Sequence, residues 1–339
     1  MMHTTLGRRS VLGGVATGAA LIAFGGRAEA APMTLRFSSS QSNDARYGNG
    51  RVYYDRLVQA LKDNKLDDQI SIRFFPDNQL GQEIDVANQI KLGVIDMTVT
   101  GASIFGNLVA PFAMLDLGYL WQDFPHQTRA FEAGAAKPLE DMLLSSANIR
   151  VCGWSYSLGA RNVLCKSPVG TPETIANKKI RTLPNPVITE VLRRMGAAAT
   201  PLAFGEVYTA MQAGVLDGVE HDAPTILNMR FAETAKYYVE TAHIYQVLGC
   251  FVSEITLKRM PAKLREGFLD ACAKAAPPAR QRALDATQEA TDALKAQGMQ
   301  IVPCDREAFR KLVVPQTAEF VRAHPEVQPI VEIVEKTGI

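Results

Sequence analysis

Two arginines, Arg161 and Arg181, are the side chains with the clearest chemistry in this sequence. Each adjoins a short apolar run typical of a β-strand, so a rigid element would hold its guanidinium. A guanidinium presents a planar fork of donors that pairs with a carboxylate through two bonds, which fixes the orientation of the acid. The pair is therefore suited to an anion clamp, although residue type and spacing alone do not establish one. The alternative is that both arginines form surface salt bridges, which contribute little.

A second group of polar residues follows Arg181 along the chain. Glu220, His221 and Asp222 are consecutive, and an imidazole beside carboxylates could bind the hydroxyls of a sugar acid. Asp222 precedes an Ala-Pro-Thr run typical of the first turn of a helix, so helix capping is its alternative role. The carboxylates could also bind a cation. Phe204 is either an apolar wall for the ligand or a core residue.

The elements that must position these residues alternate between strands and helices. Period-two apolar patterns predict strands, and apolar residues three and four apart predict helices. The strands are expected near residues 35–37, 70–74, 95–99 and 149–151, and the helices near 54–61, 82–93, 187–195 and 207–211. From Pro261 onward the pattern is helical, and Pro277-Pro278 predicts a break before a long helix that ends at Gln297. This alternation predicts an α/β fold of mainly parallel sheets.

Length and charge exclude several classes of protein. Without the three arginines and one glutamate of residues 1–30, the 36 basic and 35 acidic side chains become 33 and 34. No basic stripe is present, so no nucleic-acid partner is expected. The remaining 309 residues exceed one ordinary core and predict two domains. The apolar fraction of 47% suffices for both cores and does not indicate a membrane protein.

Residues 1–30 have the pattern of an export signal. Arg8-Arg9 precedes a Gly/Ala-rich apolar stretch, which ends in Ala28-Glu29-Ala30, a small-x-small cleavage site. The stretch is too short and too rich in glycine for a membrane span. The paired arginines and the weak hydrophobicity favour the twin-arginine route over the general route, although Val11 departs from the usual Phe. The mature protein is therefore expected in the periplasm.

Cysteine spacing and catalytic motifs do not favour an enzyme. The five cysteines lack Cys-x-x-Cys spacing, which disfavours zinc, and the sequence leaves open whether any two form a disulfide. The sequence contains no Gly-x-Ser-x-Gly, P-loop, Gly-x-Gly-x-x-Gly or His-Glu-x-x-His motif. No catalytic residue, metal site or cofactor is predicted. A metal-dependent periplasmic hydrolase remains the alternative outside transport.

An ordered series of motifs resembles one known family. Upstream of the arginines stand Phe75-Pro76-Asp77-Asn78-Gln79-Leu80-Gly81 and Gln89-Ile90-Lys91-Leu92-Gly93-Val94-Ile95-Asp96-Met97. Downstream stand Met195-Gly196-Ala197, the run from Thr200 to Gln212, and Gly214-Val215-Leu216-Asp217-Gly218-Val219-Glu220. Together they resemble the solute-binding proteins of tripartite ATP-independent periplasmic (TRAP) transporters. The resemblance runs in register from about Leu35 to the C-terminal helices.

The resemblance implies a periplasmic-binding-protein-like fold with two α/β lobes, a long helix that spans both, and a ligand cleft that closes by hinge motion. We expect lobe I at residues 31–158 plus 247–286 and lobe II at residues 159–246 plus 287–339. It also implies a TRAP membrane permease as partner, and the protein is expected to be monomeric and to carry no activity of an enzyme. A ligand-sensing role beside a receptor uses the same fold and stays an alternative.

Several site residues are implied by the same resemblance. Arg181 stands where the family's characteristic arginine binds the ligand carboxylate, Arg161 where a second arginine shares the anion or adjacent hydroxyls, and Phe204 where an aromatic ring meets the apolar side of the ligand. Three positions depart from the sialic-acid binders of the family: Ser40 replaces Asn, Gly101 replaces Glu, and His221 replaces Asn. Losing such polar partners costs selectivity for a large amino sugar, so sialic acid is not expected to bind.

The remaining polar residues favour a smaller sugar acid. His221, Glu220, Ser40 and Thr100 add hydroxyl-binding capacity to the arginine clamp, and Gln41 and Asn43 could assist. A hexuronate or related sugar acid is therefore the predicted ligand. An aromatic carboxylate or a C4-dicarboxylate is the alternative. The first would need an apolar slot from Phe204, Trp154, Phe105 and Tyr156, and the second would need another cationic contact.

Overall fold

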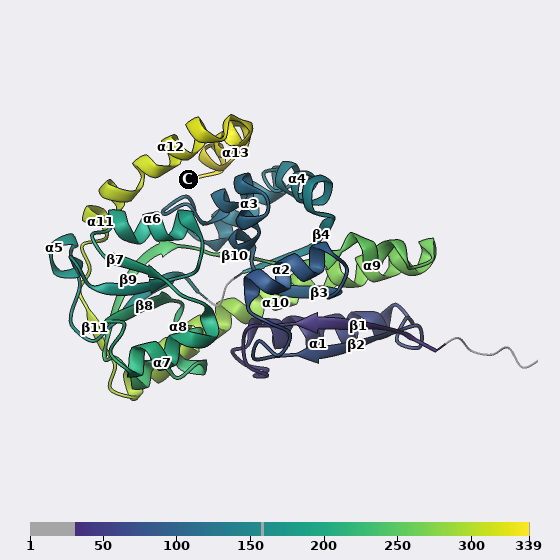
Figure 1. Cartoon of the computed structure of the whole chain (residues 1–339), viewed down its shortest axis with the longest axis horizontal. Coiled ribbons are helices and arrows are strands. Elements are labelled where there is room, and N and C mark those ends of the chain that lie inside the picture. Colours follow the sequence, from purple (N-terminus) through teal and green to yellow (C-terminus); the bar gives the residue numbers. More distant parts are fainter. Residues whose placement is uncertain (1–30, 157–158, 339) are drawn as a thin grey trace, which may run out of the picture. The chain divides into compact units, whose positions relative to one another are not determined.

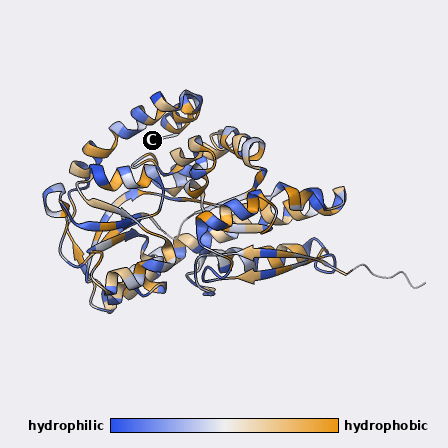
Figure 2. Cartoon of the chain, in the orientation of Figure 1, coloured by the Kyte–Doolittle hydropathy of each residue, from blue (hydrophilic) through white to orange (hydrophobic). Residues whose placement is uncertain are grey.

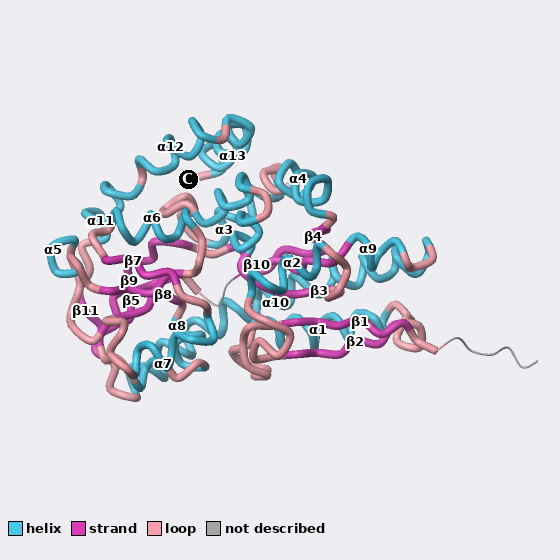
Figure 3. Tube along the Cα trace, in the orientation of Figure 1, coloured by secondary structure: helices cyan, strands magenta, loops and turns pink. Residues whose placement is uncertain are grey.

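The computed structural model describes residues 31–156 and 159–338 of the chain. The chain divides into two compact units, Met1–Ala31 and Pro32–Ile339, and all described residues except Ala31 belong to the second. The export signal predicted for residues 1–30 lies outside the described residues. Within the second unit the strands form two sheets with helices packed around them (Figure 1, Figure 3). No helix in the described ranges has both the length and the apolar character that crossing a membrane requires.

The first sheet has five strands. In order across the sheet they are β2 (Ile70–Phe75), β1 (Met33–Ser38), β3 (Met97–Gly101), β10 (Val247–Ser253) and β4 (Ile149–Tyr156). β1 pairs in parallel with β2 and β3, whereas β10 pairs antiparallel with β3 and β4. The strands expected near residues 35, 72, 97 and 150 are confirmed.

The second sheet has six strands. In order they are β11 (Gln300–Val302), β9 (Tyr237–Ile244), β5 (Arg161–Cys165), β8 (Gly218–His221), β6 (Lys179–Thr182) and β7 (Ala198–Pro201). β6 lies parallel to β7 and β8, and β11 lies parallel to β9, while β5 lies antiparallel to both of its neighbours. Arg161 and Arg181 are thus carried by strands of the same sheet.

The expectation of mainly parallel sheets is wrong for two strands, β5 and β10. A helical crossover within one sheet returns the chain in the same direction and makes parallel neighbours. β10 instead follows β9 of the other sheet, and β5 follows β4 of the other sheet. Because each enters its sheet from the opposite sheet, the crossover rule does not fix its direction, and both sheets are mixed.

Thirteen α-helices and five short 3-10 helices accompany the strands in the described ranges. The α-helices are α1 (Asn49–Asp63), α2 (Glu83–Lys91), α3 (Phe124–Glu132), α4 (Lys137–Ala147), α5 (Pro172–Ile175), α6 (Pro186–Arg194), α7 (Val207–Gln212), α8 (Ala223–Asn228), α9 (Glu254–Lys258), α10 (Ala262–Ala296), α11 (Arg306–Val313), α12 (Pro315–Ala323) and α13 (Gln328–Thr337). The 3-10 helices are η1 (Ala102–Asn107), η2 (Ala110–Asp116), η3 (Phe204–Glu206), η4 (Phe231–Glu233) and η5 (Pro325–Val327). Blue and orange residues alternate along most helices in Figure 2, as expected for helices that bury one face.

Helix α10 corrects the break predicted at Pro277-Pro278, because it continues through both prolines for 35 residues. Proline in a helix interior removes backbone hydrogen bonds and costs about 3 kcal/mol or more. Tertiary packing offsets this cost. A buried stripe of small side chains, Ala271, Ala275, Ala279, Ala283, Ala286 and Ala290, lets the helix pack closely on its neighbours. α10 contacts α1 and β4 of the first sheet and α8, which follows β8 of the second (Figure 3).

The predicted lobes share α10 and the chain crossings between the sheets. β1 to β4 and β10 form one sheet, and β5 to β9 and β11 form the other. The helices after β11 pack on different parts of the protein. Helix α11 packs on α6 and β9, whereas α13 packs on α3. The residue bounds given above for the two lobes stay a prediction.

Candidate ligand-binding site

A cavity of about 30 Å³ lies between the two sheets and gathers most of the expected site residues. One side comes from the first sheet and its loops, with Ser40, Gln41, Asn49, Glu83, Val99, Thr100 and Gly101, and the other from the second sheet, with Arg161, Leu183, Phe204 and His221. Gln246, between β9 and β10, and Leu248 complete the lining. Thr100 and Gly101 end β3, and His221 ends β8. The cavity is therefore placed at the carboxyl ends of these two strands, as in other α/β ligand sites.

Phe204 forms part of the cavity wall and part of the core. Its ring centroid lies 5.5 Å from that of His221 and 6.1 Å from that of Phe231. The Cζ of Arg181 lies 5.8 Å from the centroid of the same ring, within cation–π range. Both roles considered for Phe204 are thus compatible with its position.

Arg181 is fully buried and only partly paired. Its Nε donates to the carbonyl oxygen of Leu202 at 2.9 Å. Its two terminal nitrogens, NH1 and NH2, are buried and have no hydrogen-bond partner among the described residues. A buried charge of this kind is costly unless another group pairs with it. Arg181 does not line the cavity itself, but Phe204, over which its guanidinium lies, does.

The electrostatic surroundings of Arg181 favour an anionic partner. Burial and the nearby charge of Arg161 together lower the pKa of its guanidinium to about 10, although Glu220 and Glu83 oppose the shift. The group still carries its proton at neutral pH. The difference from its ordinary value of 12.5 corresponds to a penalty on the order of 3 kcal/mol for the charged form. A carboxylate placed against NH1 and NH2 would offset this penalty.

Arg161 is occupied by contacts within the protein. Its Nε and NH2 pair with the two carboxylate oxygens of Glu220, the NH2 contact being 2.6 Å, and NH2 also donates to the Glu220 carbonyl oxygen at 3.0 Å. Both side chains are essentially inaccessible to solvent. Burial opposes ionisation of Glu220, but Arg161 and His243 together outweigh burial and hold the pKa of that carboxyl well below its usual range.

Glu220 therefore does not contact the cavity, contrary to the expectation that it binds ligand hydroxyls. It is absent from the cavity lining, and besides Arg161 the nearest partner is Nε2 of His243 at 3.6 Å, beyond normal hydrogen-bond length. Burial lowers the pKa of His243 and keeps its imidazole neutral. Glu220 holds Arg161 in place, and Arg161 in turn reaches the cavity wall.

Gln246 connects Arg161 to Asp116 at the end of η2. Its Oε1 accepts from NH1 of Arg161 at 2.7 Å, and its Nε2 donates to Oδ2 of Asp116 at 2.9 Å. A Cβ at Gly101 would lie 2.7 Å from Nε2 of Gln246, so a larger residue there would require the Gln246 side chain to move. The departure at Gly101 thus leaves space that Gln246 fills. Neither Gln246 nor Asp116 stands in a periodic pattern or motif by which it could have been recognised.

Glu83 is the main cavity residue that sequence reasoning missed. Its Oε1 accepts hydrogen bonds from the hydroxyl of Thr100 at 2.7 Å and from that of Ser40 at 3.0 Å. The hydroxyls of Ser40 and Thr100 both line the cavity, as expected, and the Glu83 carboxylate orients them. Its position two residues after Gly81, at the start of α2, gives the same pattern as an ordinary acidic first-turn residue.

His221 lines the cavity, and the adjacent Asp222 caps a helix. Oδ1 of Asp222 accepts from the backbone N–H of Thr225 at 2.8 Å, which confirms the capping role. Nδ1 of His221 lies 3.1 Å from Oδ2 of Asp222 and 3.0 Å from the Asp222 backbone nitrogen, so it donates to the carboxylate in one tautomer and accepts the backbone N–H in the other. Burial lowers the pKa of His221 and favours the neutral ring. Nε2 of that ring can accept from or donate to a ligand hydroxyl, according to the tautomer.

The other expected contacts divide between the cavity and elsewhere. Gln41 lines the cavity, whereas Asn43 accepts a hydrogen bond from NH1 of Arg51 and is not part of the lining. Phe105 packs on Phe251 at 4.1 Å between centroids, and Trp154 packs on Phe131 at 5.1 Å, so neither forms an aromatic slot at the cavity. The side chain of Tyr156 lies outside the described part of the chain.

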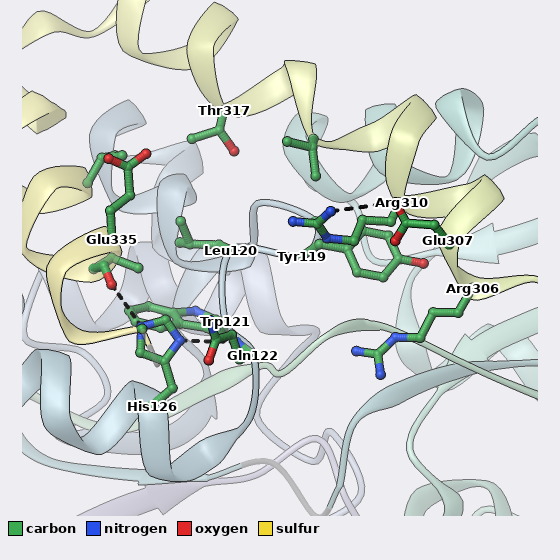
Figure 4. Close-up of a pocket in the computed structure, with 15 residues that line it drawn as sticks. Tyr119, Leu120, Trp121, Gln122, His126, Arg306, Glu307, Arg310, Thr317 and Glu335 are labelled. Atoms are coloured by element: carbon green, nitrogen blue, oxygen red, sulfur yellow. Dashed lines mark hydrogen bonds and ion pairs between the residues drawn. The ribbon is translucent and has the colours of Figure 1, made fainter.

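A larger groove of about 680 Å³ lies elsewhere, between residues 118–126 and helices α11 to α13 (Figure 4). Its charged side chains mostly serve the fold. Arg310 pairs with Glu307 at 3.8 Å, and His126 lies 2.8 Å from the Val334 carbonyl oxygen and accepts from the Gln122 backbone N–H at 3.1 Å (Figure 4). None of the expected site residues lines this groove. Size alone therefore does not identify the site.

Metal binding receives no structural support at either place. In residues 31–156 and 159–338, no three or more His, Cys, Asp or Glu side chains are arranged to hold a metal ion. Cys152, Cys250 and Cys272 are buried free thiols, as expected of small core residues. The cavity lining offers a guanidinium, hydroxyls, amides and an imidazole, which can form hydrogen bonds with an acid and its hydroxyls.

Comparison with known proteins agrees with this geometry. The model of bacterial extracellular solute-binding protein family 7, named DctP, matches residues 53–323. The chain belongs to this family. Its members are substrate-binding proteins for transport, and the solved relatives are TRAP solute-binding proteins with the same two-lobed fold. The resemblance inferred from the motifs is confirmed.

Individual relatives are similar over most of their length. A solute-binding protein of Roseobacter denitrificans is 27% identical over 300 residues, which cover 88% of this chain and 90% of that protein. The 2,3-diketo-L-gulonate-binding periplasmic protein YiaO of Escherichia coli is 25% identical over 312 residues, covering 88% of this chain and 93% of that protein.

Solved structures extend the similarity to the fold. The Roseobacter protein, solved with bound L-galactonate, has a TM-score of 0.80 at 26% identity and covers 90% of this chain and 99% of its own. A TRAP periplasmic solute-binding protein of Citrobacter koseri, solved with bound D-glucuronate, has a TM-score of 0.83 at 26% identity and covers 89% of this chain and 99% of its own.

Proposed function

We propose that this protein binds a hexuronate or a closely related sugar acid in the periplasm and delivers it to a TRAP membrane permease. The observation that carries the proposal is the buried guanidinium of Arg181, whose NH1 and NH2 have no partner among the described residues. A ligand carboxylate satisfies both nitrogens with one planar contact. Arg161 supports the site from the cavity wall while Glu220 and Gln246 hold it.

Glu83 sets the preference within the acids. Its carboxylate, with Ser40, Thr100 and His221, offers hydrogen-bonding groups suited to the hydroxyls of a polyol. A second carboxylate on the ligand would meet the Glu83 charge and be repelled. Because Arg161 is already paired with Glu220, it does not supply the further cation that a C4-dicarboxylate would need. The D-glucuronate and L-galactonate bound by similar proteins support this choice.

Export and delivery complete the proposed role. Residues 1–30 act as the export signal, with the twin-arginine route favoured by Arg8 and Arg9. The names of relatives place them in the periplasm. The protein acts as a monomer that returns its ligand unchanged, and the permease moves that ligand across the membrane.

A screen of acids tests the proposal directly. Purified protein would be melted with D-glucuronate, D-galacturonate, L-galactonate, sialic acid, a C4-dicarboxylate and an aromatic acid. A ligand present at about 100 times its dissociation constant stabilises the protein by roughly 2.7 kcal/mol. We expect that shift for at least one six-carbon sugar acid and none for millimolar sialic acid. No shift with any sugar acid would overturn the proposed ligand class, and calorimetry would then measure the acid that does bind.

Closure on the ligand is a second expected result. A cavity of about 30 Å³ holds about one water, so a six-carbon sugar acid can enter only if the two sheets separate. The lining comes from both sheets, and bound ligand would link them. We expect X-ray scattering to show a smaller radius of gyration after saturation with the best ligand than before. Arg181→Ala at the same ligand concentration is the control and should stay expanded. An unchanged radius in the parent protein would contradict a hinged cleft.

The role of Glu83 gives a third prediction. Glu83→Gln keeps the shape of the side chain but removes the charge that accepts hydroxyl hydrogen bonds. Because a hydrogen bond to a charged group contributes about 1.5–3 kcal/mol, uronate affinity should fall roughly 10- to 150-fold. The ratio of uronate affinity to C4-dicarboxylate affinity should also be smaller in the variant than in the parent.

Asp85→Asn is the matched control for Glu83→Gln. Asp85 is exposed in the same first turn of α2 and does not line the cavity. Calorimetry should give it parental affinity. Equal losses in both variants would show that the charge near the α2 N-terminus matters, and not the contact made by Glu83.

A further inference from the structure

Gln246 and Gly101 form a closely fitted pair in the wall of the ligand cavity. Both residues line the cavity. Gly101 ends β3 and pairs with Leu248 of β10, and Gln246 directly precedes β10. The pairing of two neighbouring strands of the first sheet thus fixes both backbone positions.

The backbone at Gly101 does not itself require glycine. Its φ of −58° and ψ of 126° lie in a region that other residues adopt freely. The constraint is steric, because a Cβ at this position would lie 2.7 Å from Nε2 and 3.1 Å from Cδ of Gln246. The lack of a side chain at Gly101 is therefore what allows the Gln246 amide to occupy this part of the wall.

Hydrogen bonds at both ends of its amide hold Gln246 in place. Oε1 accepts from NH1 of Arg161, which can only donate, so the orientation of the amide is fixed. Nε2 donates to Oδ2 of the buried Asp116, and the same oxygen accepts from the hydroxyl of Ser103. Gln246 is 4% exposed, and it cannot turn away from the cavity without breaking these contacts.

We propose that Gln246 sets the upper limit on ligand size, so that the site takes six-carbon sugar acids and excludes acids with a longer chain. This inference rests on the proposed function. The cavity of about 30 Å³ must enlarge to admit any sugar acid, and it enlarges where the two sheets separate. When the sheets close on a ligand, the Gln246 amide resumes its bonds to Arg161 and Asp116. This wall therefore does not yield to a longer molecule.

The competing explanation is that Gln246 only supports Arg161. Both explanations predict weaker binding when Gln246 is replaced, but only a size limit predicts a change in preference between a short and a long acid. A pocket of fixed size discriminates against one extra methylene by roughly 10- to 200-fold. The ratio of the two affinities is therefore the decisive quantity.

Two substitutions of Gln246 separate its size from its hydrogen bonds. Gln246→Ala removes both, whereas Gln246→Leu removes the hydrogen bonds but keeps a side chain of similar size. Calorimetry would measure D-glucuronate and 3-deoxy-D-manno-oct-2-ulosonic acid, an eight-carbon sugar acid, with each protein. We expect the parent to prefer D-glucuronate at least about 100-fold, Gln246→Ala to reduce this ratio at least about tenfold, and Gln246→Leu to keep it within about threefold. Lost support for Arg161 affects both variants and cancels in the comparison.

Gly101→Ala tests the same wall from the opposite side. Its Cβ would displace the Gln246 amide, so D-glucuronate affinity should fall at least about tenfold. In the Gln246→Ala background no amide is displaced, and the same substitution should change the affinity by less than about twofold. An equal loss in both backgrounds would show that Gly101 serves the backbone or another neighbour, and would count against the proposal.

Three other results would overturn the size limit. They are a parental ratio in Gln246→Ala, an equal reduction in Gln246→Leu, and equally tight binding of both acids by the parent. Near-parental D-glucuronate affinity in Gly101→Ala would also overturn it, and this variant leaves Gln246 unchanged. If the parent binds succinate but no sugar acid, the proposed ligand class fails. The ratio of succinate affinity to adipate affinity in the same three proteins then still tests the wall.

Discussion

Arg181→Ala is expected to lower affinity for the best sugar acid several hundredfold. The substitution leaves the ligand carboxylate buried without its partner, and breaking such a buried pair costs roughly 3 to 5 kcal/mol. Arg181 has no exposed surface, and its NH1 and NH2 lack partners among the described residues, so little solvent screening weakens the contact. Calorimetry on the parent and the variant measures the loss.

Arg181→Lys separates geometry from charge. Lysine keeps a positive charge but cannot present two coplanar donors to a carboxylate, so this variant should also bind poorly. Arg193→Ala is the control, because Arg193 is an exposed arginine that pairs with Glu190 on the surface of α6. It should keep parental affinity. Near-parental affinity in a folded Arg181→Ala protein would show a structural role for this arginine, and the carboxylate clamp would be rejected.

Local pattern sufficed for much of the fold. The strands around Leu35 and Ile72 and the helices around Leu57 and Val191 were predictable because their apolar periodicity reflects burial on one face. The direction of β5 and β10 was not predictable, because it depends on which sheet the chain has just left. The course of α10 through Pro277 depends on packing against partners far away in the sequence.

The residues of the candidate site also fall into those that the sequence could predict and those that it could not. Arg181, Phe204 and His221 could be found because they stand in motifs with a recognisable order. The partners of Arg161 could not, because Glu220 is 59 residues away and Gln246 is 85 residues away. Residue type predicted that Arg161 would bind an anion. Only the fold identifies that anion as a carboxylate of the protein itself.

Glu220→Ala is accordingly expected to destabilise the protein by roughly 3 to 5 kcal/mol, because it leaves Arg161 charged and buried without its partner. Urea unfolding at neutral pH would measure the change. The double variant Arg161→Met with Glu220→Leu removes both charges and should regain most of the stability, since apolar pairs of similar size often replace buried ion pairs at little cost. Glu190→Gln is the control, a partly exposed carboxylate whose substitution should cost less than about 1 kcal/mol.

Acid sensitivity distinguishes a buried ion pair from simple packing at this position. The pKa of Glu220 is lowered in the folded protein from an ordinary value of 4.5, so its contribution to stability is complete above about pH 4.5 and is lost as the pH falls through the folded value. The parent should therefore lose stability on acidification below that pH more steeply than the double variant. Parallel pH profiles, together with a Glu220→Ala loss no larger than that of Glu190→Gln, would contradict the pairing. The double variant restores packing but removes the guanidinium of Arg161 from the cavity wall. If this variant regains stability but does not regain ligand affinity, the charge of Arg161 serves the ligand site.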